Sequence, residues 1–314
     1  MNSTFAEAAG DAPRQAAPSA RIRTGQTLLM LVRREIWEHR ALWIAPLAVA
    51  ALMILGALIA GLKIHLTHSD MSARDAPDSM VMFAVMQSAV STPLSLVMLI
   101  VVSFYLLDCL YAERKDRSIL FWKSLPVSDD LTVVSKLLVA LVVVPLLVFA
   151  LGLLLSLAFV GIWEVNAAFG RVPAIPGWDT LEWLRAEMAL LVCLILGVLW
   201  YAPIAAYLLL VSAWARRSPF LWSALPPVVA PILEYVAFGT HFLRDFLRYR
   251  MFGIWGTLFS HMHMGRGRAA ALSSGLSQLD VRGAFTNIDL WLGLLVTAVL
   301  VFATIRIRRY RDDS

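Results

Sequence analysis

The sequence predicts an all-α, polytopic membrane protein, because the chain is strongly apolar and its apolar residues fall in long runs. Hydrophobic residues make up 60% of the 314 residues, charged residues make up only 16%, and the mean hydropathy is +0.73. Soluble chains of this length carry more charge. A helical crossing needs about 20 apolar residues, which predicts six transmembrane helices at 41–62, 81–107, 131–162, 186–213, 219–238 and 289–305.

The stretches outside these spans define the domain organisation. Residues 27–310 are expected to form one transmembrane domain, followed by a short cytoplasmic tail at 311–314. Residues 1–26 are rich in Ala, Ser, Pro and Arg and lack the apolar centre of a signal peptide, so we expect a disordered cytoplasmic tail. Cys109 and Cys193 lie in or beside apolar runs, which favours small buried hydrophobes over a disulfide.

The distribution of cations predicts the orientation of the chain. Most of the 27 Lys and Arg residues lie in the N-terminal segment, the second and fourth loops and the C-terminal tail. Because short cytoplasmic loops carry the excess of Lys and Arg, both termini are expected in the cytoplasm. The loop 239–288 also carries cations, but long loops weigh less in this rule.

The first span is preceded by an amphipathic stretch from Thr27 to Arg40. Helical spacing places its apolar and charged residues on opposite sides, with Leu28, Leu29, Val32 and Ile36 across from Arg34, Glu35 and Glu38. This pattern favours an interfacial helix parallel to the bilayer. The alternative is that the stretch simply extends the first span.

The fifth span carries three prolines and an acid. Pro226, Pro227 and Pro231 free backbone groups that neighbouring helices or water must satisfy, which predicts a broken helix facing protein. Glu234 near its end is a candidate substrate contact, because ionisable groups inside a span are rare. The alternative is a neutral or hydrogen-bonded carboxyl near the outer interface.

The loop after the fifth span contains an apolar stretch that is too short to cross. Met251 to Met262 is interpreted as a re-entrant or interfacial helix at the external surface. His261 and His263 have no third ligand at a recognisable spacing, so no metal site is expected.

Between the second and third spans lies the most informative stretch of the chain, Glu113 to Asp130. Cations and acids flank an apolar group in it: Arg114, Lys115, Arg117 and Lys123 with Glu113, Asp116, Asp129 and Asp130 around Ile119, Leu120, Phe121, Trp122 and Leu125. Such a segment cannot enter lipid and is too apolar for a solvated loop. We expect it to dock against another protein at the cytoplasmic surface, and Ser128 to begin the next helix.

No catalytic motif is present in the sequence. A P-loop needs a Gly directly before its Lys, and none of the four lysines has one. Signatures of serine hydrolases and zinc proteases are also missing. The chain is therefore not expected to be an enzyme or to hydrolyse ATP by itself.

These features together resemble the permease subunit of type-2 ATP-binding-cassette exporters. The stretch from Tyr111 to Leu138, YAERKDRSILFWKSLPVSDDLTVVSKLL, is similar to that family's sequence around its cytoplasmic coupling helix. The resemblance spans about residues 27 to 310, although its motif is short. It implies that this short helix sits in a cleft of a soluble ATPase, with Arg114, Lys115, Arg117, Ser118, Phe121, Trp122, Lys123, Ser124 and Leu125 as interface residues.

The resemblance also implies the partners and the substrate path. The partners would be soluble ATPase subunits, which hold ATP and Mg²⁺, and a second permease, most simply another copy, in a bacterial-type inner (plasma) membrane. This chain itself would hold no cofactor and bind no nucleic acid. The path would lie between the permeases, at Met82, Met86, Gln87, Ser91, Thr92 and Glu234, and these side chains suit an amphipathic or hydrophobic cargo such as a lipid, peptide or drug.

Three alternatives remain open from the sequence. The segment between the second and third spans could be an ordinary loop folded on its own helices. The chain could be an ion-coupled secondary transporter, although no internal repeat is found and only Glu234 was identified well inside a span. An interfacial enzyme using His261 and His263 would need acids beside them, and only the distant Asp245 and Asp280 are available.

Overall fold

The computed structural model describes residues 24–66, 79–116, 128–170, 180–258 and 279–310, and every regular element in these ranges is helical. The helices are α1 (Thr24–Glu38), α2 (Ala41–Leu66), α3 (Ser79–Lys115), α5 (Asp129–Leu138), η1 (Val139–Val143), α6 (Val144–Ala168), α7 (Thr180–Trp214), α8 (Pro219–Phe238), α9 (Phe242–Leu258), α11 (Val281–Thr286) and α12 (Ile288–Tyr310). Six are long and apolar enough to cross a membrane: α2, α3, the continuous α5–η1–α6, α7, α8 and α12. The six-span prediction is confirmed at this level.

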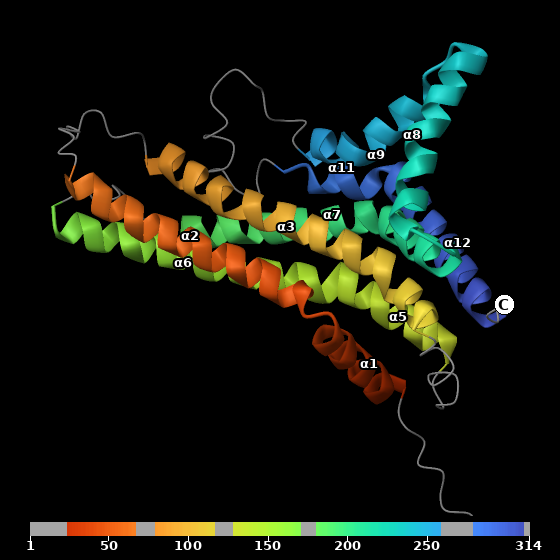
Figure 1. Cartoon of the computed structure of the whole chain (residues 1–314). Helices are drawn as coiled ribbons and strands as arrows, with labels where there is room; N and C mark the ends of the chain where they lie inside the picture. Colours follow the sequence, from red (N-terminus) through yellow and green to blue (C-terminus); the bar gives the residue numbers. More distant parts are fainter. Residues whose placement is uncertain (1–23, 67–78, 117–127, 171–179, 259–278, 311–314) are drawn as a thin grey trace, which may run out of the picture.

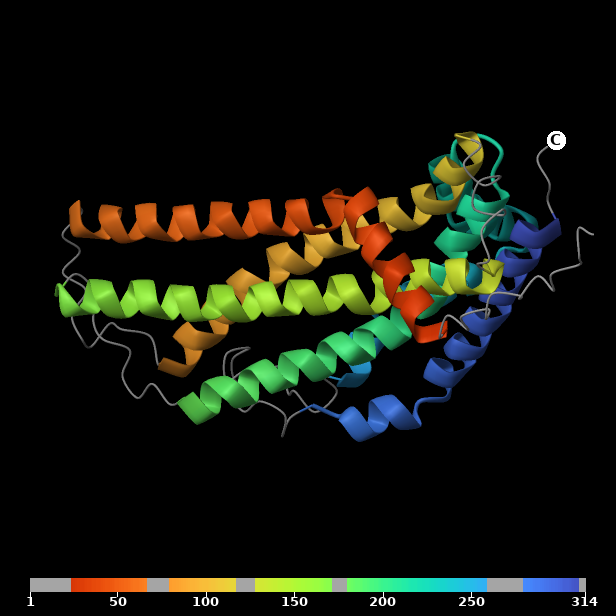
Figure 2. The ribbon, with the colours of Figure 1, turned by 90° about the horizontal axis from the view of Figure 1, so that it is seen from below.

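The long helices form a bundle, with α2, α3, α6 and α7 running side by side (Figures 1 and 2). The helix α12 packs on α7, while α9 and α11 lie along the upper edge of the bundle in Figure 1, where α9 packs on α7 and α11 on α9 and α12. One end of the bundle gathers α1, the last turns of α3, the start of α5 and the last turns of α12 (Figure 1). The two ends of the described chain therefore lie on the same side, as an even number of spans requires.

The helix α1 is separate from the first span. It ends at Glu38, the chain turns at Arg40, and α2 then runs at an incline to α1 (Figure 2). The predicted faces of α1 hold only in part: Val32 of the apolar face is buried, but Glu35, placed on the polar face, is only 1% exposed. Glu35 is buried because α1 packs on α5 and the carboxylate meets a lysine there. The depth of α1 in a membrane stays a prediction.

The third span contains a five-residue π-helical stretch, η1, directly before Pro145. Proline has no backbone N–H and clashes with the preceding turn, so the regular hydrogen-bond ladder cannot continue through it. The widened turn accommodates this loss without ending the helix, and Asp129–Ala168 runs as one span of 40 residues.

The helix α8 departs from the prediction of a broken, protein-facing helix. It is continuous from Pro219 to Phe238, leaves the bundle at a steep angle (Figure 1), and is exposed over most of its length. Its prolines free the carbonyls of Trp222 and Ser223, each four residues before a proline. The Tyr207 hydroxyl on α7 lies 3.3 Å from both oxygens and donates to them, so the helix survives at this point.

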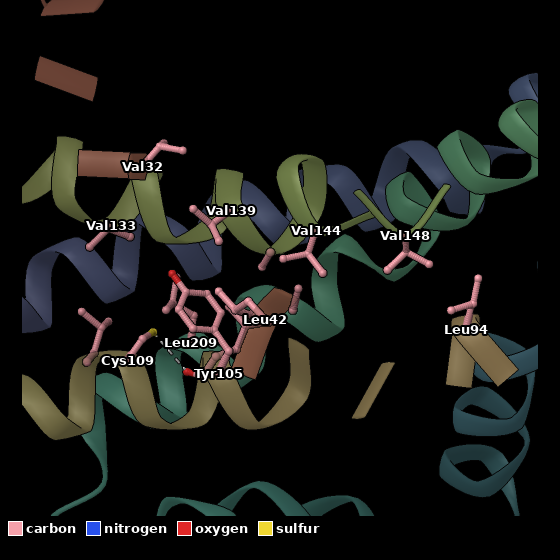
Figure 3. Packing of buried hydrophobic residues seen from close by; sticks show 14 of the residues in the cluster. Val32, Leu42, Leu94, Tyr105, Cys109, Val133, Val139, Val144, Val148 and Leu209 are labelled. Atoms are coloured by element: carbon pink, nitrogen blue, oxygen red, sulfur yellow. Dashed lines mark hydrogen bonds between the residues drawn. The ribbon is translucent and has the colours of Figure 1, made fainter. Parts of the chain in front are cut away.

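An apolar core joins the helices at the end where α1 lies. Figure 3 shows Val133 and Val139, from α5 and η1, facing Tyr105 and Cys109 of α3. All four side chains are at most 4% exposed. This core supports the charged groups described next, which adjoin it through Tyr105 and Lys136.

Candidate functional site at the stems of the coupling segment

The candidate site surrounds the ends of residues 117–127, here called the coupling segment. Of the predicted interface residues, Arg114 and Lys115 are described. The other seven lie outside the described residues: Arg117, Ser118, Phe121, Trp122, Lys123, Ser124 and Leu125. The two stems are the end of α3 and the start of α5. Ser128 caps the second stem by accepting from the Leu131 N–H at 3.3 Å, which confirms that it begins this helix.

Arg114 ties the first stem to α7. Its guanidinium donates to the backbone oxygens of Ser212 at 2.6 Å and Ala215 at 2.9 Å, at the carboxyl-terminal end of α7. A cation at that position also complements the helix dipole. Lys115, by contrast, is exposed. Of the two, Lys115 is the side chain free to meet a partner protein, while Arg114 holds the stem in place.

A single arginine at the end of α12 joins both stems. Arg308 donates from Nη1 to Glu113 Oε2 at 2.6 Å and from Nε to Asp129 Oδ1 at 2.9 Å. Glu113 precedes the coupling segment and Asp129 follows it. The Arg308 side chain is only 4% exposed, so this fork is a buried clamp that fixes the two stems relative to each other and to α12.

Lys136 of α5 connects the first stem, through Glu113, to Glu35 of α1. Its ammonium lies 2.8 Å from Glu35 Oε1 and 2.9 Å from Glu113 Oε1, and its side chain is 1% exposed. Arg34 approaches both of these carboxylates at 3.3 Å from the outside, while the Tyr105 hydroxyl donates to Glu35 Oε2 at 3.1 Å. We call this set the charged hub: Arg34, Glu35, Glu113, Asp129, Lys136 and Arg308.

The hub is balanced in charge, with three cations and three carboxylates. Burying a charge is costly unless it is paired and hydrogen-bonded, and every member here has an opposite charge within 3.3 Å. His39 lies at the edge, with Nε2 3.7 Å from Glu35 Oε2 and its ring edge-on to Tyr105. Burial lowers the pKa of His39 against the opposing pull of Glu35, and Lys136 lowers it further. His39 therefore adds no fourth cation at neutral pH.

The hub is not evident as a unit from the sequence. Lys136 and Arg308 stand there only among the loop and tail cations, and helical spacing places Glu35 on the polar face of α1. A signal was present, since Lys136 stands in the apolar run from Val133 to Val144. A charge in such a run must find a partner inside the protein.

The predicted substrate-path residues are divided by the structure. Gln87 is buried and donates to Glu187 Oε1 on α7 at 3.0 Å, Met86 and Ser91 are half-buried and Thr92 is exposed. The side chain of Met82 is not described. Glu234 caps α9, accepting from the N–H groups of Phe242 and Leu243 at 2.8 and 2.7 Å and from the Thr240 hydroxyl at 2.6 Å. These bonds favour the interpretation of Glu234 as a hydrogen-bonded carboxyl over that of a substrate contact.

The helix α9, which follows the fifth span, is joined to its neighbours through Arg250. The Arg250 guanidinium of α9 lies over the Trp200 ring at 4.4 Å and donates to the backbone of Trp200 and Asp289, joining α7 and α12. Within the described ranges, no cluster of His, Cys, Asp and Glu has the geometry of a metal site. His261 and His263 lie outside the described residues.

Comparison of the chain with protein-family models, with curated proteins and with solved structures finds no match.

Proposed function

We propose that this chain is the membrane-spanning subunit of an ATP-binding-cassette exporter, with ATP hydrolysis on a separate soluble ATPase. It would work in a bacterial-type inner membrane beside a second permease, most simply another copy. The chain itself would be no enzyme. Its cargo would be amphipathic or hydrophobic, such as a lipid, peptide or drug.

One observation carries the proposal: the buried Arg308 fork joins the two stems of the coupling segment. An ordinary surface loop needs no such clamp, because its ends are held by their own helices. Burying the four charges of Glu35, Glu113, Lys136 and Arg308 at under 6% exposure is costly in free energy. Such a cluster is stable only when every charge is paired, and full pairing holds the side chains in one rigid geometry. A segment that must transmit force needs stems that do not yield.

The contacts of the hub define how a displacement would travel. A push on the coupling segment reaches Glu113 and Asp129 first and passes through Arg308 into α12. Through Lys136 and Glu35 it reaches α1, and through Arg114 it reaches the end of α7. Closely packed helices move as rigid bodies when their contacts are fixed in this way.

The docking energy would come from the coupling segment itself. Phe121 and Trp122 are the large apolar side chains in it, and buried aromatic anchors dominate protein interfaces, with about 2 kcal/mol or more lost on truncation of a hot spot. The charges around them would set the choice of partner and the register.

The test is retention of the ATPase in detergent after Phe121→Ala and Trp122→Ala are combined. A soluble ATPase with Walker motifs is sought in the neighbouring reading frame, co-expressed with this chain and purified through a tag on the chain. Two anchors of about 2 kcal/mol each predict roughly a thousandfold weaker complex if their effects add. The double variant should reach the membrane at normal levels and lose the ATPase.

A matched control is Asp130→Ala, which removes an exposed charge on the second stem but no apolar anchor and no predicted interface residue. We expect it to retain the ATPase at low salt. Full retention by the double variant would remove the coupling segment as the docking element, and with it the proposed function.

A further inference from the structure

A second polar cluster lies inside the bundle, in a part of α7 well separated from the hub. Glu187 on α7 is 2% exposed, and Oε1 accepts hydrogen bonds from Gln87 Nε2 of α3 at 3.0 Å and from the Ser156 hydroxyl of α6 at 2.9 Å. Ser156 in turn accepts from Trp183 Nε1 at 2.8 Å. Glu187 falls within the fourth candidate span, about one turn after its first residue, Trp183.

The donors of the cluster leave one oxygen of Glu187 free for a proton. The indole N–H of Trp183 can only donate, which directs the Ser156 hydroxyl hydrogen toward Glu187. Glu187 Oε1 therefore receives two hydrogen bonds. Both hydrogen bonds described for Glu187 end on Oε1, and the buried Gln87 Oε1 has no partner among the described residues.

A carboxylic acid and a primary amide satisfy each other with two hydrogen bonds, one N–H···O and one O–H···O. Gln87 and Glu187 already form the first of these. The second requires a proton on Glu187 Oε2, which would then be donated to Gln87 Oε1. Because buried polar atoms are nearly always hydrogen-bonded, the unpartnered Gln87 oxygen indicates that the hydrogen-bond pattern is incomplete without this proton.

The charges on the surrounding helices do not supply an alternative partner. None of the described ion pairs includes Glu187. The charged side chains on α7 and on the helices around it are Asp108, Glu113, Arg114, Lys115, Asp129, Asp130, Lys136, Glu164, Arg185, Glu234, Arg244, Asp245, Arg248, Arg250, Asp289, Arg306, Arg308 and Arg309. Arg250 meets α7 at Trp200, roughly three and a half turns further along. Metal cations fit less well, since the polar groups are already in contact at hydrogen-bond distance.

We propose that Glu187 and Gln87 form a proton-binding site inside the membrane domain, in which Glu187 Oε2 takes a proton from a hydronium ion, which leaves as water, and the new O–H donates a hydrogen bond to Gln87 Oε1. No other covalent bond changes. The site joins α3, α6 and α7, so proton binding adds a second bond between α3 and α7. This proposal concerns the chain alone and does not depend on an ATPase.

The test is infrared difference spectroscopy of the full-length chain in lipid vesicles during acidification. A protonated carboxyl has a C=O stretch separate from that of a carboxylate, and the wild type should gain such a band. Glu187→Gln should lose this band, while Glu164→Gln should keep it, because Glu164 is an exposed glutamate on α6. An unchanged band in folded Glu187→Gln protein would overturn the proposal.

Gln87→Leu provides the second arm and does not require Glu187→Gln to fold. Without the Gln87 oxygen as acceptor, the band of the protonated Glu187 should move to higher wavenumber. A band at the wild-type position in this variant would show that the proton is not donated to Gln87 and would refute the acid–amide pair.

Discussion

Replacing Lys136 with methionine is the sharpest perturbation of the charged hub. Methionine has similar length and adds no polar atom, so the change removes one charge and leaves packing nearly intact. Glu35 and Glu113, which are 1% and 5% exposed, lose their bonds of 2.8 and 2.9 Å to the ammonium. Removing one partner of a buried ion pair costs about 3–5 kcal/mol, because a charge is left buried without compensation.

The comparison with Arg34→Met tests whether burial causes this cost. Arg34 contacts the same two carboxylates, but it is 21% exposed and its bonds are 3.3 Å long. Screened, partly exposed pairs contribute about 1 kcal/mol or less. Lys115→Met, an exposed change near the stem, should alter stability by less than about 0.5 kcal/mol.

The assay is unfolding of the purified variants in mild detergent by added dodecyl sulfate, followed by circular dichroism. Combining Lys136→Met with Glu35→Gln should recover part of the loss, with an interaction energy of about 1–3 kcal/mol between the two sites. If Lys136→Met destabilises the chain no more than Arg34→Met, burial of the ion pair does not set the cost of losing the charge.

Two further predictions concern other parts of the fold. A Cβ at Gly293 would meet the Arg250 guanidinium, whereas nothing lies within 4 Å of one at Gly56. Gly293→Ala should therefore lower the free energy of unfolding by about 1–3 kcal/mol, while Gly56→Ala should leave it unchanged or raise it by up to about 1 kcal/mol. Equal thermal unfolding midpoints of the two variants would contradict this. The folded pKa of His39 lies below its ordinary value of 6.5, so the stability from neutral His39 is fully present above pH 6.5 and is lost as the pH falls through the folded pKa. Unfolding midpoints should fall less between about pH 7 and about pH 5 in His39→Gln than in the wild type, and parallel decreases would argue against a buried neutral His39.

The features that the sequence predicted correctly depend on local properties. The six spans follow from the length of apolar runs, and the start of α5 follows from Ser128 before two acids. Both signals lie within one or two helical turns, so no knowledge of the rest of the fold is needed.

The features that it missed depend on distant partners. Lys136 and Glu35 are 101 positions apart, and nothing near Glu35 distinguishes its carboxylate from that of the exposed Glu38. The same holds for α8, where three prolines predicted a break and the Tyr207 hydroxyl from α7 compensates for two of them. Pairing of this kind is decided by helix packing, which a hydropathy pattern does not encode.

We expect the hub to hold both stems of the coupling segment rigidly together. Spin labels at Lys115 and Asp130 flank that segment at exposed sites, and the two native cysteines are buried. Pulsed electron paramagnetic resonance of the chain in nanodiscs measures the distance between these labels. We expect one narrow distance distribution in the wild type and a broad one in Arg308→Lys, because an ammonium cannot reproduce the fork between Glu113 and Asp129. A broad distribution in the wild type, or an equally narrow one in Arg308→Lys, would contradict this expectation.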